Sequence, residues 1–241
     1  MIDEHLKGHH KTVSTAVDPA TSRKNEWLYT FVFRSVYGSL TNVWGYESDK
    51  ITKYYGKDAS LFTRFFYNKM VWYEALHASI LFGVYYFLGW ESLKFYFFYI
   101  IMGLYWVETV NYIEHYGILR KKDENGVDES INKMHSWNQL SGAIIVRLQR
   151  HSDHHEHSFR PYQILRRMDE APFMPFEYLH CYQLAAIPPV WFHIMNPRVQ
   201  ALDDIKNGRK NKKHSQWNNI MPETDDDLSR KRVGWATIGV L

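Results

Sequence analysis

MVWYEALHASILFGVYYFL (Met70–Leu88) and LKFYFFYIIMGLYWVETVNY (Leu93–Tyr112) are two apolar runs of about twenty residues each, separated only by Gly89–Ser92. A helix of that length rises ~30 Å, which is one crossing of a lipid bilayer. Both runs are apolar on every side, whereas a surface helix of a soluble protein has a polar face. We therefore expect an all-α membrane protein with a transmembrane helical hairpin, rather than two core helices of a soluble protein.

The charges that flank the two runs predict how the hairpin is oriented. Basic residues near spanning helices stay on the cytoplasmic side. The linker side of the hairpin has only Lys94 nearby, whereas the two outer ends carry Arg64, Lys69, Arg120, Lys121 and Lys122. We expect the N-terminal region and everything after Tyr116 to be cytoplasmic, at the inner membrane if the protein is bacterial.

These expectations divide the chain into four regions. They are a cytoplasmic segment 1–69, the transmembrane hairpin 70–116, a cytoplasmic helical cap 117–200 and a polar C-terminal tail 201–241. Inside them, hydrophobic spacing and turn residues predict an amphipathic helix 27–46, a break 50–58, a charged loop 121–130, a helix 136–157 and an interfacial or packed segment 176–192.

The composition excludes several classes of protein. Hydrophobic residues make up 45% of the chain and aromatic residues 17%, so disorder is not expected. A net charge of +3, without a recognisable nucleic-acid-binding motif, does not indicate a nucleic-acid partner. The single cysteine, Cys181, excludes an internal disulfide framework and a thiolate metal site built by this chain alone. The unusual feature is the number of histidines, which is 13.

Seven of these histidines fall in three short clusters: EHLKGHH (4–10), NYIEHYG (111–117) and LQRHSDHH (148–155). On an α-helix, His5 and His9 share a face, while His10 lies about a hundred degrees further round, so that adjacent histidines reach different metals. In the third cluster, the spacing i, i+3, i+4 places three imidazoles on one stripe. Neutral imidazole binds iron, copper, zinc or nickel, so the clusters predict a metal site.

Each cluster also places a carboxylate beside a histidine: Glu4, Glu114 and Asp153. A metal-binding histidine usually donates its second ring N–H to such a group, which predicts that these three support the ligands without binding the metal. A single histidine is more often an ordinary surface residue, and we interpret the remaining ones as structural or surface groups. They are His77, His135, His157, His180, His193 and His214.

The three clusters closely resemble the histidine boxes of the membrane-bound alkane monooxygenases. Ser136-Trp137-Asn138, Arg160–Gln163 and Asn196–Arg198 also resemble segments of that family in the same order, so the resemblance runs from Asp3 to Val199. It implies a non-haem centre of two Fe whose ligands here are His5, His9, His10, His115, His151, His154 and His155.

The implied reaction is hydroxylation of the terminal carbon of a linear alkane with O2. Electrons would come from rubredoxin and its reductase, and the basic residues after the second run would suit an acidic partner, although topology alone explains them equally well. The resemblance also implies an earlier His-Glu-x-x-His box, which nothing in this sequence matches. We therefore expect a truncated chain, or a separately encoded half, that does not turn over alone. The alternatives are a fatty-acid desaturase or hydroxylase of the same histidine-rich class, and a non-catalytic membrane subunit.

Overall fold

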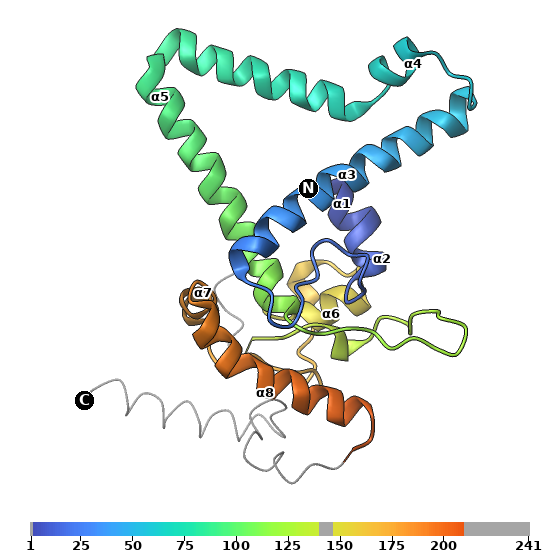
Figure 1. Cartoon of the computed structure of the whole chain (residues 1–241), viewed down its shortest axis with the longest axis vertical. Helices are drawn as coiled ribbons and strands as arrows, with labels where there is room; N and C mark the ends of the chain where they lie inside the picture. The colour runs from blue at the N-terminus through green and yellow to red at the C-terminus, as the bar shows by residue number, and fades with distance from the viewer. Residues whose placement is uncertain (1, 140–146, 210–241) are drawn as a thin grey trace.

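The computed structural model describes residues 2–139 and 147–209, and this part of the chain is built from helices (Figure 1). The β-structure of these residues is limited to two isolated bridges, Lys122–Asp128 and Asn138–Phe173. The elements are α1 (Ile2–Glu4), the π-helix η1 (His5–His9), α2 (His10–Thr12), α3 (Leu28–Tyr55), α4 (Leu61–Phe66), α5 (Lys69–His115), the 3-10 helix η2 (Lys133–His135), α6 (His151–Glu156), the 3-10 helix η3 (Tyr162–Ile164), α7 (Tyr178–Ala185) and α8 (Pro188–Lys206).

Helix α5 contains both apolar runs in 47 residues and bends once, at Gly89, where φ is 82° and ψ is 179°. Its two arms diverge from this bend, as Figure 1 shows, and helical structure resumes directly after Gly89. The expected four-residue linker is therefore reduced to one glycine. Only 11% of the most apolar stretch of α5 is buried, whereas a core helix of a soluble protein would be mostly buried. By length and composition, α5 is suited to a membrane.

Helix α3 confirms the amphipathic helix expected at 27–46, but it is longer. A buried stripe begins at Leu28 and Phe31 and continues to Glu47 and Ile51. The helix ends at Tyr55, so the break expected at 50–58 begins only at position 56. The helix ends where Gly56 adopts a φ of 83°, a conformation that glycine reaches without a steric cost. Helix α3 packs against α5, and α4 connects the two helices at the far end (Figure 1).

The hydrophobic core lies where the end of α5 meets the start of α3, α7 and α8. Tyr112, Tyr116, Trp137 and Trp191 are completely buried there. Three of these side chains have paired polar atoms: the Tyr112 hydroxyl donates to the Glu26 carbonyl at 2.6 Å, the Tyr116 hydroxyl donates to Asn196 at 2.9 Å, and the Trp137 indole N–H donates to the Tyr116 carbonyl at 2.9 Å. This core fixes the last turn of α5 and, with it, the second histidine box.

The prediction of a helix at 136–157 is wrong for most of the residues described there, because only α6 (His151–Glu156) is helical. Asn138 instead pairs its backbone with the segment Pro172–Met174, and Gln139 donates its amide to the Gln149 carbonyl at 3.1 Å. Segment 176–192 is packed: it forms α7 and the start of α8, with Cys181 and Trp191 buried. Helix α8 runs past position 200 to Lys206. The expected tail from position 210 onward, including His214, lies outside the described residues.

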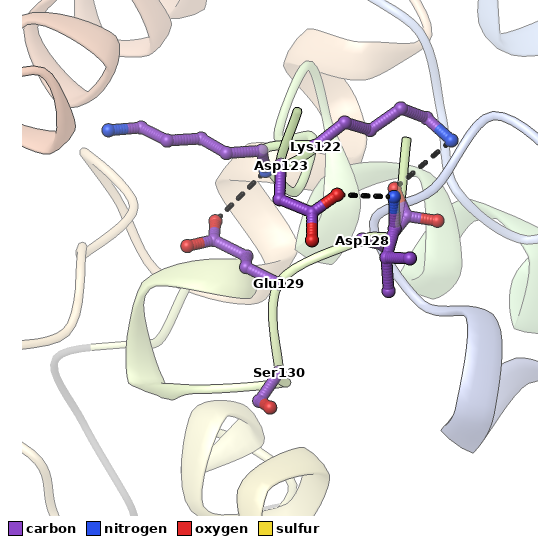
Figure 2. Close-up of a pocket in the computed structure, with 7 residues that line it drawn as sticks. Lys122, Asp123, Asp128, Glu129 and Ser130 are labelled. Carbon is purple, nitrogen blue, oxygen red and sulfur yellow. Dashed lines mark hydrogen bonds and ion pairs between the residues drawn. The ribbon is translucent and has the colours of Figure 1, made fainter. Parts of the chain in front are cut away.

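The charged loop expected at 121–130 is present between α5 and η2. A bridge between Lys122 and Asp128 closes it, and the Asp123 side chain accepts hydrogen bonds from the amides of Asn125 and Val127 at 2.9 and 2.8 Å. The loop lines an open hollow of about 340 Å³ (Figure 2). Lys122 extends over the loop towards Asp128, at 3.5 Å.

The bend at Gly89 gives a test of the fold. Its φ and ψ lie in a region that essentially only glycine adopts, so Gly89→Ala should destabilise the bend by about 1–3 kcal/mol. No atom lies within 4 Å of the added Cβ, so the effect would come from the backbone alone. Gly83→Ala and Gly103→Ala are matched controls within the arms, with equally open surroundings, and should be neutral or stabilising. Thermal unfolding in detergent would contradict the bend if all three variants behaved alike.

Candidate metal centre

The first histidine box forms a π-helical turn, η1, instead of an α-helix. A π-helix pairs residues five apart, so His5 and His10 share a face, with their Nε2 atoms 3.1 Å from each other. His9 also lies beside His5, with stacked rings whose centroids are 5.2 Å apart, but its ring nitrogen belongs to a different histidine group. The adjacent residues His9 and His10 are separated as expected. A Cβ on Gly8 would lie 2.6 Å from the Tyr46 hydroxyl and from a carboxylate oxygen of Glu4, so the box lies close against α3 and a larger residue would require these side chains to move.

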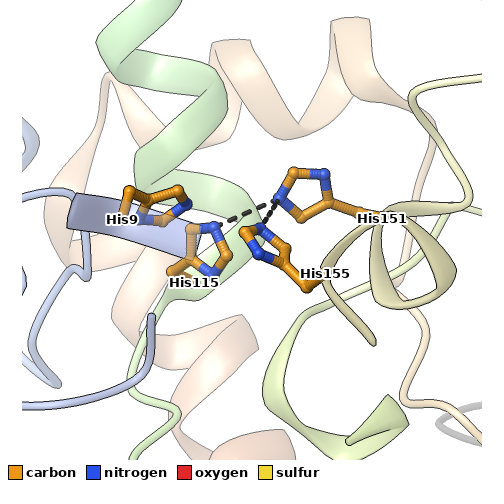
Figure 3. Close-up of side chains that lie close together, drawn as sticks. All are labelled: His9, His115, His151 and His155. Carbon is orange, nitrogen blue, oxygen red and sulfur yellow. Dashed lines mark hydrogen bonds between the residues drawn. The ribbon is translucent and has the colours of Figure 1, made fainter. Parts of the chain in front are cut away.

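The four-histidine group comprises His9, His115, His151 and His155, and all four are buried. Figure 3 shows their rings facing one another from the N-terminal box, the end of α5 and α6. The Nε2 atom of His151 lies 3.1 Å from Nε2 of His115 and 2.9 Å from Nε2 of His155. His9 Nε2 is buried and has no hydrogen-bond partner among the described residues.

The three-histidine group comprises His5, His10 and His154. Nε2 of His5 lies 3.1 Å from Nε2 of His10 and 3.5 Å from Nε2 of His154. Helix α6 therefore supplies residues to both groups. The seven histidines that the sequence singled out are all brought together, four in one group and three in the other.

The spacing of the ring nitrogens suits metal binding. Two nitrogens that each lie ~2.1 Å from one ion, at 90° to 109° to each other, are ~3.0 to 3.4 Å apart. His151 Nε2 also lies 3.1 Å from a carboxylate oxygen of Glu114. A ring nitrogen carries at most one proton, which cannot satisfy three such neighbours, whereas a cation can. The donor set therefore fits a metal ion in each group.

Burial favours the neutral imidazole, which is the form that binds metals. It lowers the pKa of His151 and His155 well below the usual value, and nearby histidines lower it further. In the more exposed group, burial and neighbouring rings lower the pKa of His5 to about 3 and that of His10 to about 4.

Asp18 is a functional residue that sequence reasoning missed. Its carboxylate accepts a hydrogen bond from Nδ1 of His9 at 2.9 Å, and both side chains are buried. This contact directs His9 Nε2 to the four-histidine group. Burial alone would raise the pKa of Asp18, but the contacts with His9 and Thr21 lower it below its usual value. In the sequence, Asp18 is followed by Pro19, a pair that indicates a turn and gives no sign of a contact with His9.

The sequence predicted that Glu114 accepts a hydrogen bond from the second ring N–H of a metal-binding histidine. The described structure does not show such a contact. One oxygen of Glu114 contacts the Tyr178 hydroxyl, and the other lies 3.1 Å from His151 Nε2, the atom that faces the other histidines. Nδ1 of His151 is buried without a hydrogen-bond partner among the described residues. Glu114 therefore lies on the side of the ring where a metal would be.

Asp153 and Glu4 also differ from the expectation. Asp153 forms an ion pair with Arg160 and accepts a hydrogen bond from the Arg166 amide at 2.7 Å, and His157 Nδ1 lies 3.1 Å from its carboxylate. It therefore anchors the segment after α6. Burial would raise its pKa, but these contacts lower it. Glu4 is buried and accepts a hydrogen bond from Asn42 of α3 at 3.4 Å.

The histidines outside the boxes have structural or surface positions. His135 is fully buried, but its Nδ1 accepts from the Asn132 amide at 3.0 Å and its Nε2 lies 2.9 Å from Glu129. His77 is exposed on the first arm of α5, beside Glu74. His180 and His193 are exposed on α7 and α8.

Comparison with known proteins agrees with this arrangement. Residues 1–185 match the family model described as fatty acid desaturase, so the chain belongs to the fatty acid desaturase family. Among its curated relatives are alkane 1-monooxygenases, which confirms the resemblance found in the histidine boxes. Alkane 1-monooxygenase 2 of Alcanivorax borkumensis is 36% identical over 203 residues, covering 82% of this chain and 51% of the relative.

Two further relatives extend the comparison. Alkane 1-monooxygenase of Ectopseudomonas oleovorans is 37% identical over 199 residues, covering 81% of this chain and 48% of the relative. The xylene/toluene monooxygenase hydroxylase component XylM of Pseudomonas putida is 28% identical over 207 residues, covering 83% of this chain and 52% of the relative. The chain thus spans about half the length of the curated relatives it matches.

The Asp18–His9 pair gives a test of the centre. Asp18→Asn removes the charge that fixes the ring of His9, and loss of such a partner typically weakens metal affinity ~10–100-fold. We expect this loss in a chelator-competition titration with Fe(II), with little change in the helical circular dichroism.

Asp153→Asn is the matched comparison, because Asp153 contacts Arg160 and no member of either histidine group. Leaving the partner of a buried ion pair unpaired typically costs about 3–5 kcal/mol of stability. This variant should therefore unfold at a lower temperature. Equal metal affinity in Asp18→Asn and the wild type would remove Asp18 from the centre.

Proposed function

We propose that this chain carries most of the metal centre of a membrane alkane monooxygenase that hydroxylates the terminal carbon of a linear alkane. The observation that carries the proposal is the position of two groups of imidazoles, four and three, at the end of a long apolar helix. Similarity to the alkane 1-monooxygenases supports the same reaction.

The proposed cofactor is two non-haem Fe, one in each group. His9, His115, His151 and His155 would hold one, and His5, His10 and His154 the other. Imidazole alone accepts several metals, but monooxygenation requires a redox-active one, which zinc is not. When bound, the iron pair supplies the activation of O2 and the cleavage of the C–H bond.

The chain's own residues bind and place the substrate. A linear alkane has no polar group, so burial of its chain against apolar side chains provides the binding free energy, ~0.8 kcal/mol per CH2. His115 is the last residue of α5, so the arm that contains Leu93–Tyr112 leads directly to the four-histidine group. This continuity would guide an alkane end to the metals.

The reaction balances as one alkane, one O2, two electrons and two protons, giving one alcohol and one water. The electrons require an outside donor, because a single cysteine cannot build an iron–sulfur centre. We propose rubredoxin, supplied by its reductase. It would dock on the side of the membrane that carries the histidine groups.

We further propose that the chain is an integral membrane protein with both histidine groups on the cytoplasmic side. A cysteine placed at Ser92, beside the bend of α5, should react with a membrane-impermeant thiol reagent from the non-cytoplasmic side, and one placed at Asp123 should not. The native Cys181 is fully buried and should stay silent. Labelling of Asp123 but not Ser92 from that side would reverse the orientation.

A fatty-acid desaturase or hydroxylase is the second candidate, because the matching family model carries the name fatty acid desaturase. The two candidates differ in substrate, since a fatty acyl chain carries a polar end and an alkane does not. A non-catalytic membrane subunit is the third candidate, and it would not need to bind iron.

Product analysis separates these candidates. The full chain in detergent, loaded with Fe(II), is supplied with rubredoxin, reductase and O2, together with octane or an acyl substrate. We expect two irons per chain and, because the chain should not turn over alone, at most residual formation of 1-octanol from octane. The rate should be below that of the Ectopseudomonas oleovorans enzyme, because the resemblance implies a histidine box that this sequence does not match. A product from the acyl substrate alone would favour the desaturase, and failure to bind iron would favour the subunit.

A further inference from the structure

The chain reverses direction directly after the first histidine box, in a strained turn at Ser14. Ser14 has a φ of 59°, which is unfavourable for a residue with a Cβ. Three hydrogen bonds hold it: its amide donates to the Thr21 hydroxyl at 2.8 Å, its hydroxyl donates to the His135 carbonyl at 2.7 Å, and its carbonyl accepts from the Arg120 amide at 2.7 Å. Strain of this kind persists only where the surroundings over-determine it.

The side chain of Arg120 holds the same turn. Nε donates to the Val13 carbonyl at 2.8 Å and Nη2 to the Lys11 carbonyl at 2.7 Å, while Nη1 donates to the Glu129 carbonyl at 3.2 Å. Lys11 and Val13 lie at the C-terminal end of the first box, where helix carbonyls lack partners within the helix. A planar guanidinium can donate hydrogen bonds to several such carbonyls at once. A lysine ammonium lacks this fixed planar arrangement of N–H donors.

Arg120 also follows His115 by five positions, in the segment directly after the second box. It therefore links that segment to the residues at the end of the first box. His9 and His115 come from these two boxes, and their ring centroids are 4.8 Å apart. We propose that Arg120 is a positioning residue, which fixes the first histidine box against the second and so sets the geometry of both histidine groups. The proposal rests on the proposed function in that those groups hold metal.

This role differs from the one suggested by sequence, in which Arg120 belongs with Lys121 and Lys122 to a basic surface for an acidic partner. All three guanidinium nitrogens of Arg120 donate to backbone carbonyls of the protein itself. Lys122, in contrast, has a side chain that is 59% exposed and pairs only loosely with Asp128. The two residues carry the same charge in the same segment, so they form a matched pair for experiment.

The test compares Arg120→Lys, Arg120→Gln and the control Lys122→Gln in the full chain in detergent. Iron affinity is measured by chelator competition with Fe(II), and amide hydrogen exchange is measured without metal. The apparent KM for rubredoxin gives a third readout. We expect both Arg120 variants to lose iron affinity ~10-fold or more, as for other residues that orient ligands. Exchange should accelerate locally around Val13 and Ser14, and Lys122→Gln should match the wild type in both measurements.

Three outcomes would overturn the proposal. In the first, Arg120→Lys retains wild-type iron affinity and exchange, so that the charge alone suffices. In the second, Arg120→Gln changes only the KM for rubredoxin, which is the behaviour of a docking residue. In the third, exchange rises equally throughout the protein, as for general loss of stability. If the wild type binds no iron, the proposed function fails, and the metal-free exchange data still decide whether Arg120 holds the turn.

Discussion

Each imidazole nitrogen carries at most one proton, and this limit governs the region where the histidine boxes meet. At His151, two ring nitrogens and one carboxylate oxygen surround Nε2 within 3.1 Å. Burial favours the neutral form of His151 and His155, and their ring nitrogens lie close to one another in a space from which water is largely excluded. A cation in each group would bind these closely spaced nitrogens, which cannot all be paired through protons. The surrounding contacts hold the rings in the positions that such binding needs.

Three features bring the boxes to the same place. The buried rings of Tyr112, Tyr116 and Trp137 hold the last turn of α5, which ends at His115. The π-helical turn of the first box directs His5 and His10 to one group and His9 to the other. The strained turn at Ser14 then returns the chain so that Asp18 reaches His9. The apolar arms of α5 extend away from the two histidine groups. A long apolar helix is thus directly connected to a polar site.

The seven clustered histidines could be predicted because their spacing is a local property of the sequence. The pairing within the groups could not, because an α-helix was assumed where the chain winds as a π-helix. Asp18 was missed for a different reason: it lies nine positions from His9 and meets it only after the turn at Ser14. Asp153 was wrongly predicted to support a metal-binding histidine, because it neighbours His154 in sequence but pairs with Arg160 in the structure. Proximity in sequence predicted which histidines lie close together, but it predicted their supporting contacts poorly.

The central claim is that the seven histidines form two separate metal sites. The most direct measurement is a cryo-EM or anomalous-diffraction map of the full chain loaded with Fe(II). The account predicts two metal peaks, one among the Nε2 atoms of His9, His115, His151 and His155, and one among those of His5, His10 and His154. A single peak shared by all seven rings, or two peaks with His9 and His5 bound to the same ion, would contradict it.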